Sequence, residues 1–139
     1  MKVNLLIIEA DNFFRKNLAQ RLPDEKKWRV LFAEHQIEAI QMIKSKKIDV
    51  VLLGLKELKK EGLMILKEIK TICPLTEVIT INRADQIALS IEGMKLGAFD
   101  DFIVPFELES LVRRVRDAYQ HKKKNDTLKK KGGTKPVPT

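Results

Sequence analysis

Two kinds of hydrophobic pattern alternate along the first 120 residues, and this alternation limits the chain to very few folds. Short apolar runs, such as residues 3–8 and 49–53, are rich in β-branched residues and predict buried strands. Between these runs, apolar residues recur every three or four positions, as they do along one face of an α-helix. Strict alternation of strands and helices predicts a parallel sheet covered by helices on both faces.

The pattern predicts five strands and five helices. We expect the strands over residues 3–8, 28–32, 49–53, 77–81 and 101–104. We expect the helices over residues 12–22, 35–45, from just after Gly62 to just before Pro74, 85–96 and 107–121. Asp11 or Asn12 caps the first helix and Asp85 the fourth, while Gly97 suits the position just past a helix end. With right-handed crossovers, this order gives a doubly wound, flavodoxin-like sandwich.

The net charge of +8 is concentrated at the end of the chain. Residues 122–139 hold seven lysines and one acid, Asp126, so they contribute +6 of the total. This segment also contains Gly132, Gly133, Pro136 and Pro138 and has few apolar residues. We therefore expect a nearly neutral domain over residues 1–121 and a basic, disordered tail over residues 122–139.

Length and composition favour a cytoplasmic globular protein. A chain of 139 residues suits one domain with a substantial core. The longest apolar runs hold about six residues, whereas a helix needs roughly 20 to cross a bilayer. The first apolar stretch is too short for a signal peptide and meets Glu9 at once. The single cysteine, Cys73, cannot form an internal disulfide, so nothing in the sequence indicates an oxidising compartment.

Ligands of open α/β sheets bind at the carboxyl ends of the strands, so the residues at these positions bear most directly on function. Here they are Glu9, Ala10, Gly54, Asn82 and Val104. Only Glu9 carries a charge, and Gly54 has no side chain at the end of the most apolar strand. This edge of the sheet therefore offers little catalytic chemistry.

Three segments, residues 49–63, 76–82 and 91–106, resemble a known family. The most specific is Lys-Leu-Gly-Ala-Phe-Asp over residues 95–100, followed by Pro-Phe-Glu-Leu over residues 105–108. In order and spacing, these segments are similar to the receiver domains of two-component response regulators, over residues 3 to about 120. They most resemble the receivers that precede enhancer-binding ATPase modules.

The resemblance implies a phosphorylation pocket that has lost its chemistry. In the family, an aspartate at the position of Gly54 accepts a phosphoryl group. Acids at the positions of Glu9 and Ala10 bind Mg²⁺ together with that aspartate. A hydroxyl residue at the position of Asn82 and a lysine at the position of Val104 contact the phosphoryl group. We therefore expect a degenerate pocket with no catalytic residue, no metal and no cofactor, in a protein that is not an enzyme.

The remaining acids have simpler expected roles. Asp11 would face the metal position if the first strand ended two residues later, but helix capping is the favoured role. Asp49 begins its strand at the opposite edge of the sheet and is expected to be structural. Trp28, Phe13, Phe14 and Met42 are expected in the core, and neither His35 nor His121 has partners at metal-binding spacing.

The family's conformational switch is also altered. An aromatic residue of the fifth strand swings inward on phosphorylation in the family, and its position here is Asp101. A charged side chain does not bury readily in such a slot. We therefore expect one dominant conformation, with Asp100 and Asp101 solvated or paired with an arginine, Arg113 or Arg114.

The resemblance also indicates a surface for partners. Receivers of this type dimerise or dock through the face formed by the helix over 85–96, the strand over 101–104 and the helix over 107–121. The candidate interface residues are Lys95, Asp100, Arg113 and Arg114; alternatively, these charges form solvated ion pairs worth less than about 1 kcal/mol each. The resemblance further implies a cis peptide bond before Pro105.

Three classes of function remain. The first is a phosphorylation-independent pseudo-receiver that binds a protein partner: a kinase, another regulator or a second copy of itself. The second is an adaptor whose lysine-rich tail binds nucleic acid or another acidic surface, with a strong dependence on salt. The third is a small-molecule sensor or enzyme that uses the altered pocket, although no glycine-rich phosphate loop, catalytic triad or metal cluster supports it.

Overall fold

The computed structural model describes residues 2–22 and 27–132. In these residues the elements are β1 (Val3–Ile8), α1 (Asn12–Gln20), β2 (Trp28–Ala33), α2 (Gln36–Ser45), β3 (Val50–Gly54), α3 (Leu55–Leu58), α4 (Lys60–Ile72), β4 (Glu77–Arg83), α5 (Ile87–Lys95), β5 (Asp100–Val104) and α6 (Leu108–Gly132). The five strands form one parallel sheet in the order β2-β1-β3-β4-β5. This confirms the predicted doubly wound sandwich.

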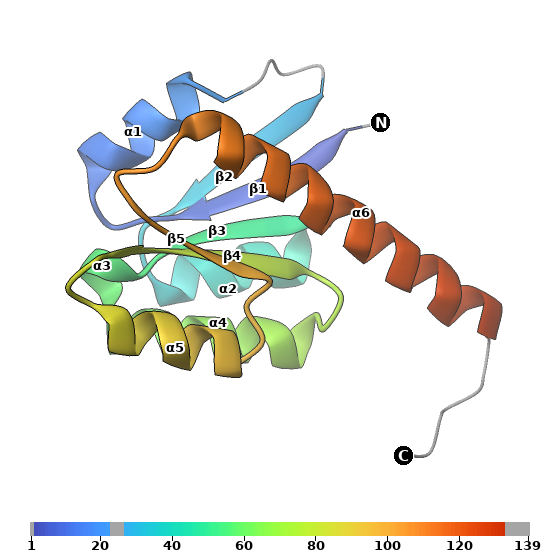
Figure 1. Ribbon diagram of the computed structural model, residues 1–139. Helices are drawn as coiled ribbons and strands as arrows, with labels where there is room; N and C mark the ends of the chain where they lie inside the picture. Colours follow the sequence, from blue (N-terminus) through green and yellow to red (C-terminus); the bar gives the residue numbers. More distant parts are fainter. Residues whose placement is uncertain (1, 23–26, 133–139) are drawn as a thin grey trace.

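Helices cover both faces of the sheet (Figure 1): α1 and α6 lie on one face, and α2, α4 and α5 lie on the other. Successive side chains of a strand point to opposite faces. In β1, Leu5 and Ile7 join the core cluster that includes residues of α1 and α6, whereas Leu6 and Ile8 join the cluster with α2 and α4. Burial on both faces explains why the central strands are almost continuously apolar.

The starts of two helices differ from the prediction. A short helix, α3, follows Gly54 directly, and α4 begins at Lys60, so Gly62 lies inside α4 rather than before it. Helix α5 begins at Ile87 after Gln86, and Asp85 does not cap it. Asp85 instead pairs with the neighbouring Arg83 at 2.7 Å, because that cation competes for the carboxylate that would otherwise cap the helix.

Other local predictions are confirmed. The Asp11 carboxylate caps α1 by accepting a hydrogen bond from Phe14 N at 3.1 Å. Gly97 follows α5 with a φ of 105°, a conformation that glycine adopts without strain. The Val104–Pro105 peptide bond is cis. Trp28 is buried in the core, but Phe13 is 71% exposed, so its predicted place in the core is wrong.

Helix α6 contradicts the predicted boundary near residue 121, because it continues through residues expected to be disordered. Lys122 is buried, and its ammonium group donates a hydrogen bond to Asp49 Oδ1 at 2.9 Å. Lysine is a good helix former, and residues 108–131 contain no glycine or proline. The helix therefore runs past the edge at which the strands begin (Figure 1). Residues 133–139 of the predicted tail, like Pro23, lie outside the described residues.

None of the helices in the described part of the chain is both long and apolar enough to span a lipid bilayer.

Candidate functional site: the carboxyl edge of the sheet

The parallel strands bring the predicted pocket residues to one edge of the sheet. Glu9 directly follows β1, Gly54 ends β3, Asn82 is the penultimate residue of β4 and Val104 ends β5. Glu9 and Asn82 are buried, Val104 is half-buried and Ala10 is exposed. The prediction that these residues lie at the carboxyl edge of the sheet is therefore confirmed. The contacts of their side chains decide which chemistry this edge can support.

The carboxylate of Glu9 lies against the backbone of Gly54. A Cβ atom placed on Gly54 would be 2.7 Å from Glu9 Cδ and closer still to Oε1, a separation that real Cβ atoms essentially never show. The φ and ψ angles of Gly54, −80° and 111°, are those of an ordinary extended residue. A larger residue at position 54 would therefore require the Glu9 carboxylate to move, whereas the backbone conformation itself would accept one.

Glu9 is held in a largely dry environment. Its Oε2 accepts a hydrogen bond from Asp11 N at 2.9 Å, whereas Oε1 is buried with no partner among the described residues. Burial raises the pKa of the Glu9 carboxyl group, and the Asp11 N–H bond and the charge of Lys56 oppose this rise. The Glu9 backbone is fixed as well, because Arg15 Nη1 donates to its carbonyl oxygen at 2.7 Å.

A cation that the sequence did not predict lies at this edge. Lys56, in the short helix α3, pairs with Asp11 through a contact of 3.1 Å between Nζ and Oδ2. The Phe14 N–H bond, and then Lys56, lower the pKa of Asp11. Lys56 also lies 4.8 Å from the centre of the Phe14 ring. Asp11 therefore serves as helix cap and ion-pair partner together, and each of its carboxylate oxygens already has a partner within the chain.

Asn82 and Asp101 belong to one hydrogen-bond network. Asp101 Oδ1 accepts bonds from Thr80 Oγ1 and from Asn82 Nδ2, the latter at 3.0 Å. Asn82 Nδ2 also lies 3.1 Å from Ser90 Oγ in α5. The prediction that Asp101 pairs with an arginine is wrong: the residue is half-buried, and its Oδ1 is bound by two polar neighbours on β4. Thr80 and Ser90 were missed because no local motif marks them.

Val104 lines an apolar cleft instead of supplying a charge. The cleft has a volume of about 520 Å³ and lies between α1 and the segment that follows β5. Its walls include Phe13, Phe14, Val104, Pro105 and Phe106. The exposure of Phe13 is therefore explained by its position at the rim of this cleft.

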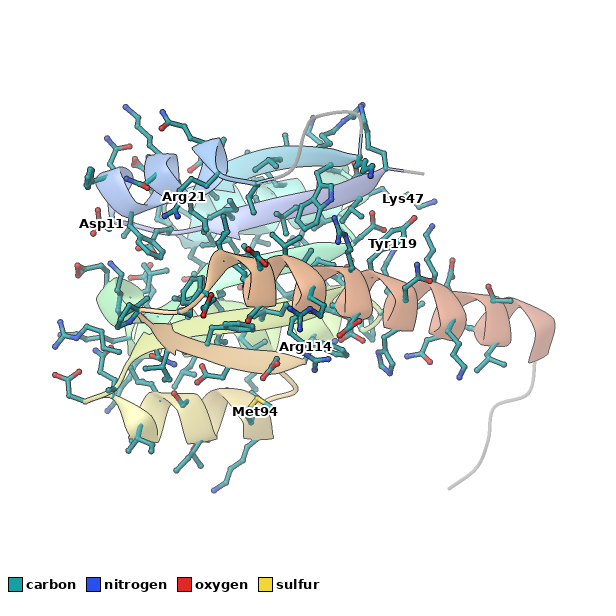
Figure 2. The ribbon with its side chains drawn as sticks, turned by 45° about the horizontal axis from the view of Figure 1, so that its top comes forward. Asp11, Arg21, Lys47, Met94, Arg114 and Tyr119 are labelled. Atoms are coloured by element: carbon teal, nitrogen blue, oxygen red, sulfur yellow. The ribbon has the colours of Figure 1, made fainter. Side chains whose placement is uncertain are left out.

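The candidate interface residues divide into two groups. Arg114 is engaged within the chain: it contacts Asp100 at 2.7 Å and Asp117 at 3.0 Å, and it lies over the Phe99 ring. The bond to Asp100 raises the pKa of Arg114. Lys95 and Arg113 are exposed and form no ion pair within the described ranges. Figure 2 shows Met94 of α5 and Arg114 of α6 on the side of the molecule where α5, β5 and α6 lie.

A parallel five-stranded sandwich with this strand order is the flavodoxin-like α/β fold, the class to which receiver domains belong. The chain matches the response regulator receiver domain over residues 5–116. It therefore belongs to the receiver domain family of two-component response regulators.

Individual relatives agree with this assignment. The chain is 27% identical to the transcriptional regulatory protein ZraR of Klebsiella oxytoca over 86% of its own length and 27% of that protein. It is 25% identical to the response regulator MprA of Mycobacterium ulcerans over 91% of its length and 54% of that protein. The chain thus spans about half or less of these relatives.

Among solved structures, the receiver domain of a response regulator from Clostridium thermocellum is similar, with a TM-score of 0.76 and 28% identity. That similarity covers 87% of this chain and 97% of the other.

Proposed function

We propose that this chain is a pseudo-receiver, which accepts no phosphoryl group, catalyses no reaction and acts by binding a protein partner. The contact between Glu9 and Gly54 carries this proposal. Glycine offers no nucleophile, and the space that an acceptor side chain at position 54 would need holds the Glu9 carboxylate. A phosphoryl donor therefore meets no attacking group at the end of β3.

The residues at this edge do not fit Mg²⁺, the ion that phosphoryl transfer in this family requires. Magnesium needs close oxygen ligands in octahedral geometry. Ala10 and Gly54 have no side-chain oxygens, and the Asp11 carboxylate is engaged by Lys56 and Phe14 N. In the described ranges, no group of three or more His, Cys, Asp or Glu residues is arranged to hold a metal ion. The proposed function accordingly uses no metal and no cofactor.

The network around Asp101 supports a single conformation. Asp101 ties β5 to β4 through Thr80 and Asn82, and Asn82 continues the connection to Ser90 in α5. Moving Asn82 toward the pocket would break its bonds to both Asp101 and Ser90. Buried polar groups left without partners cost about 1–3 kcal/mol each. The switch face is therefore held in place by polar bonds inside the chain.

An apolar stripe on α5 is the best candidate for the partner surface. Ile87, Ile91 and Met94 are spaced at i, i+4 and i+7, and their exposed fractions are 66%, 52% and 45%. Ile103 of β5, also exposed, adds to the same face. The exposed Lys95 follows Met94 in the same helix and adds a charge beside the stripe, whereas Arg113 of α6 lines a cleft with Arg21 of α1 and is not part of it. Its partner would be a kinase, another regulator in the cytoplasm or a second copy of the chain.

Phosphorylation is tested with a small phosphodonor such as acetyl phosphate, in the presence of Mg²⁺. We expect no increase in intact mass, whereas a receiver domain that retains its acceptor aspartate, treated in parallel, gains one phosphoryl group. A hydroxylamine-labile adduct on this chain, mapped to the carboxyl ends of β1, β3 or β4, would overturn the proposal.

The interface is tested with the double variant Ile87→Asp/Ile91→Asp. Sedimentation velocity and pull-down should show loss of self-association or of partner capture, while the circular dichroism spectrum stays unchanged. Phe13→Asp is the matched control, because Phe13 is equally exposed but lies on α1. If the control has the same effect as the double variant, the stripe is not the partner surface.

The alternative of a nucleic-acid adaptor has less support. It assigns the lysines of residues 122–139 to phosphate binding, but Lys122 is buried and its ammonium group is bound to Asp49. At least this lysine is used for folding, so the basic charge of the segment is not all available to a partner.

A further inference from the structure

A second cleft lies at the opposite edge of the sheet, where the strands begin. It has a volume of about 540 Å³ and is enclosed by three parts of the chain: the end of α2 and the loop to β3, the loop from α4 to β4, and the second half of α6. Its size falls within the range of small-molecule sites, roughly 300–1,000 Å³. The family match assigns no role to this edge.

The walls of this cleft are fixed by hydrogen bonds. Thr76 Oγ1 donates to the Ile48 carbonyl oxygen at 2.9 Å, which joins the two loops directly. Lys70 Nζ donates to the carbonyl oxygens of Pro74 and Thr76, both at 2.8 Å. Asn4 Nδ2 donates to the Lys47 carbonyl oxygen at 2.8 Å. On the third side, the buried Lys122–Asp49 ion pair anchors α6. The cleft is therefore largely formed before any ligand arrives.

The charge of the cleft is strongly positive. Five lysines line it, and Lys122 is the only one of them that forms an ion pair with another described residue. The other four are exposed: Lys44, Lys46, Lys47 and Lys129. Asp126 is the one acid in the lining, so the unpaired lysines leave an excess of three positive charges. Lys47 lies at this edge of the sheet in Figure 2. The positive charges in this cleft repel one another, so the binding of an anion there lowers their electrostatic energy.

The inner wall of the cleft is apolar. Ile43, Ile48, Pro74 and Leu75 line it beside Cys73, and Ile48 is buried. A ligand that matches both features has a flat or compact apolar body and several negative charges at one end. Lysine ammonium groups bind phosphate as point charges. An excess of three positive charges suits a diphosphate or triphosphate group.

We propose that this cleft binds a small phosphorylated molecule with an apolar body, of which a nucleotide is the simplest example. Lys46, Lys47 and Lys129 hold the phosphates, and the apolar body lies against Pro74 and Leu75, the accessible apolar residues of the lining. An extended nucleic acid fits less well, because the lining contains no aromatic residue on which successive bases can stack. The site is separate from the degenerate pocket, so it stands whether or not the chain is a pseudo-receiver.

The test uses the full chain and four probes: ATP, ADP, pyrophosphate and adenosine. Isothermal titration and thermal unfolding should show binding of ATP and ADP, with a melting temperature that rises with ligand concentration. Pyrophosphate and adenosine should each bind about tenfold or more weakly than ATP, because each keeps only half of the interactions. Raising the salt concentration should weaken ATP binding, because the lysines are exposed.

The triple variant Lys46→Gln/Lys47→Gln/Lys129→Gln should weaken ATP binding about tenfold or more. The control Lys16→Gln/Lys60→Gln/Lys67→Gln removes the same charge from exposed positions outside the cleft and should bind as wild type does. Equal weakening in both variants would show attraction to net charge only and would overturn the proposal. So would pyrophosphate or adenosine binding as tightly as ATP, a single-stranded oligonucleotide binding where ATP does not, or no binding at all.

Discussion

Replacing Gly54 with alanine measures how firmly Glu9 fills the acceptor position. The added Cβ overlaps Glu9 Cδ and Oε1, and overpacking of a buried site costs about 1–3 kcal/mol. Glu9 can move aside only by giving up the Asp11 N–H bond, so the overlap is not relieved freely. Against this, the extended backbone of Gly54 accepts alanine, which stabilises by about 0.4–1 kcal/mol through the unfolded state.

The Glu9→Ala background separates the two effects. The three heavy atoms nearest to the added Cβ, outside its chain neighbours, are all in the Glu9 carboxyl group. Without that side chain the closest overlaps are removed, so Gly54→Ala should change sign and stabilise by about 0.4–1 kcal/mol. The coupling between the two positions should be about 1 kcal/mol or more.

Urea unfolding, followed by the fluorescence of the buried Trp28, measures all four proteins of this cycle. With a slope of about 1–3 kcal/mol per molar, a coupling of 1 kcal/mol makes the midpoint shifts caused by Gly54→Ala in the two backgrounds differ by about 0.3–1 M. If Gly54→Ala has the same effect in both backgrounds, Glu9 does not fill the space and the main support for the pseudo-receiver is lost.

Three further predictions concern other contacts. Because burial raises the pKa of Glu9, the folded state binds its proton more tightly than the unfolded state, so the destabilisation by this carboxylate grows as pH rises above the ordinary value of 4.5. Glu9→Gln should therefore stabilise the chain more at pH 7 than at pH 4 in urea titrations. Lys122→Ala should cost about 3–5 kcal/mol because it leaves Asp49 charged and buried, while Asp49→Asn/Lys122→Met should cost clearly less in the same assay. Arg114→Ala should cost only about 1 kcal/mol, part of it lost at high salt in thermal unfolding, since its ion pairs are half-exposed.

Hydrophobic periodicity was sufficient to predict the sheet. The strands over 3–8, 49–53 and 77–81 are buried on both faces, so their apolar runs are long and unambiguous. Residues at the strand ends could also be located, because parallel strands place their carboxyl ends along one edge. The positions of Glu9, Gly54 and Asn82 in the pocket followed from this rule.

Side-chain partners could not be predicted, because they lie far apart in the sequence. Lys122 and Asp49 are 73 positions apart, and their ion pair extends α6 into a segment whose composition indicated disorder. Thr80 and Asp101 are 21 positions apart. Their hydrogen bond holds the Asp101 carboxylate against β4, although we expected this carboxylate in solvent or paired with an arginine. The prediction for Asp85 was wrong for the opposite reason. Its partner, Arg83, is only two positions away in the sequence, and the carboxylate pairs with this arginine instead of capping α5.

The overlap at Gly54 also bears on how the proposed pseudo-receiver could be given an acceptor side chain. A lone aspartate at position 54 would enter an occupied site, next to a second carboxylate and with no lysine at position 104. Under this proposal, an aspartate at position 54 needs the Glu9 side chain to move or to be replaced. Packing therefore couples the two positions, so that a substitution at one depends on the residue at the other.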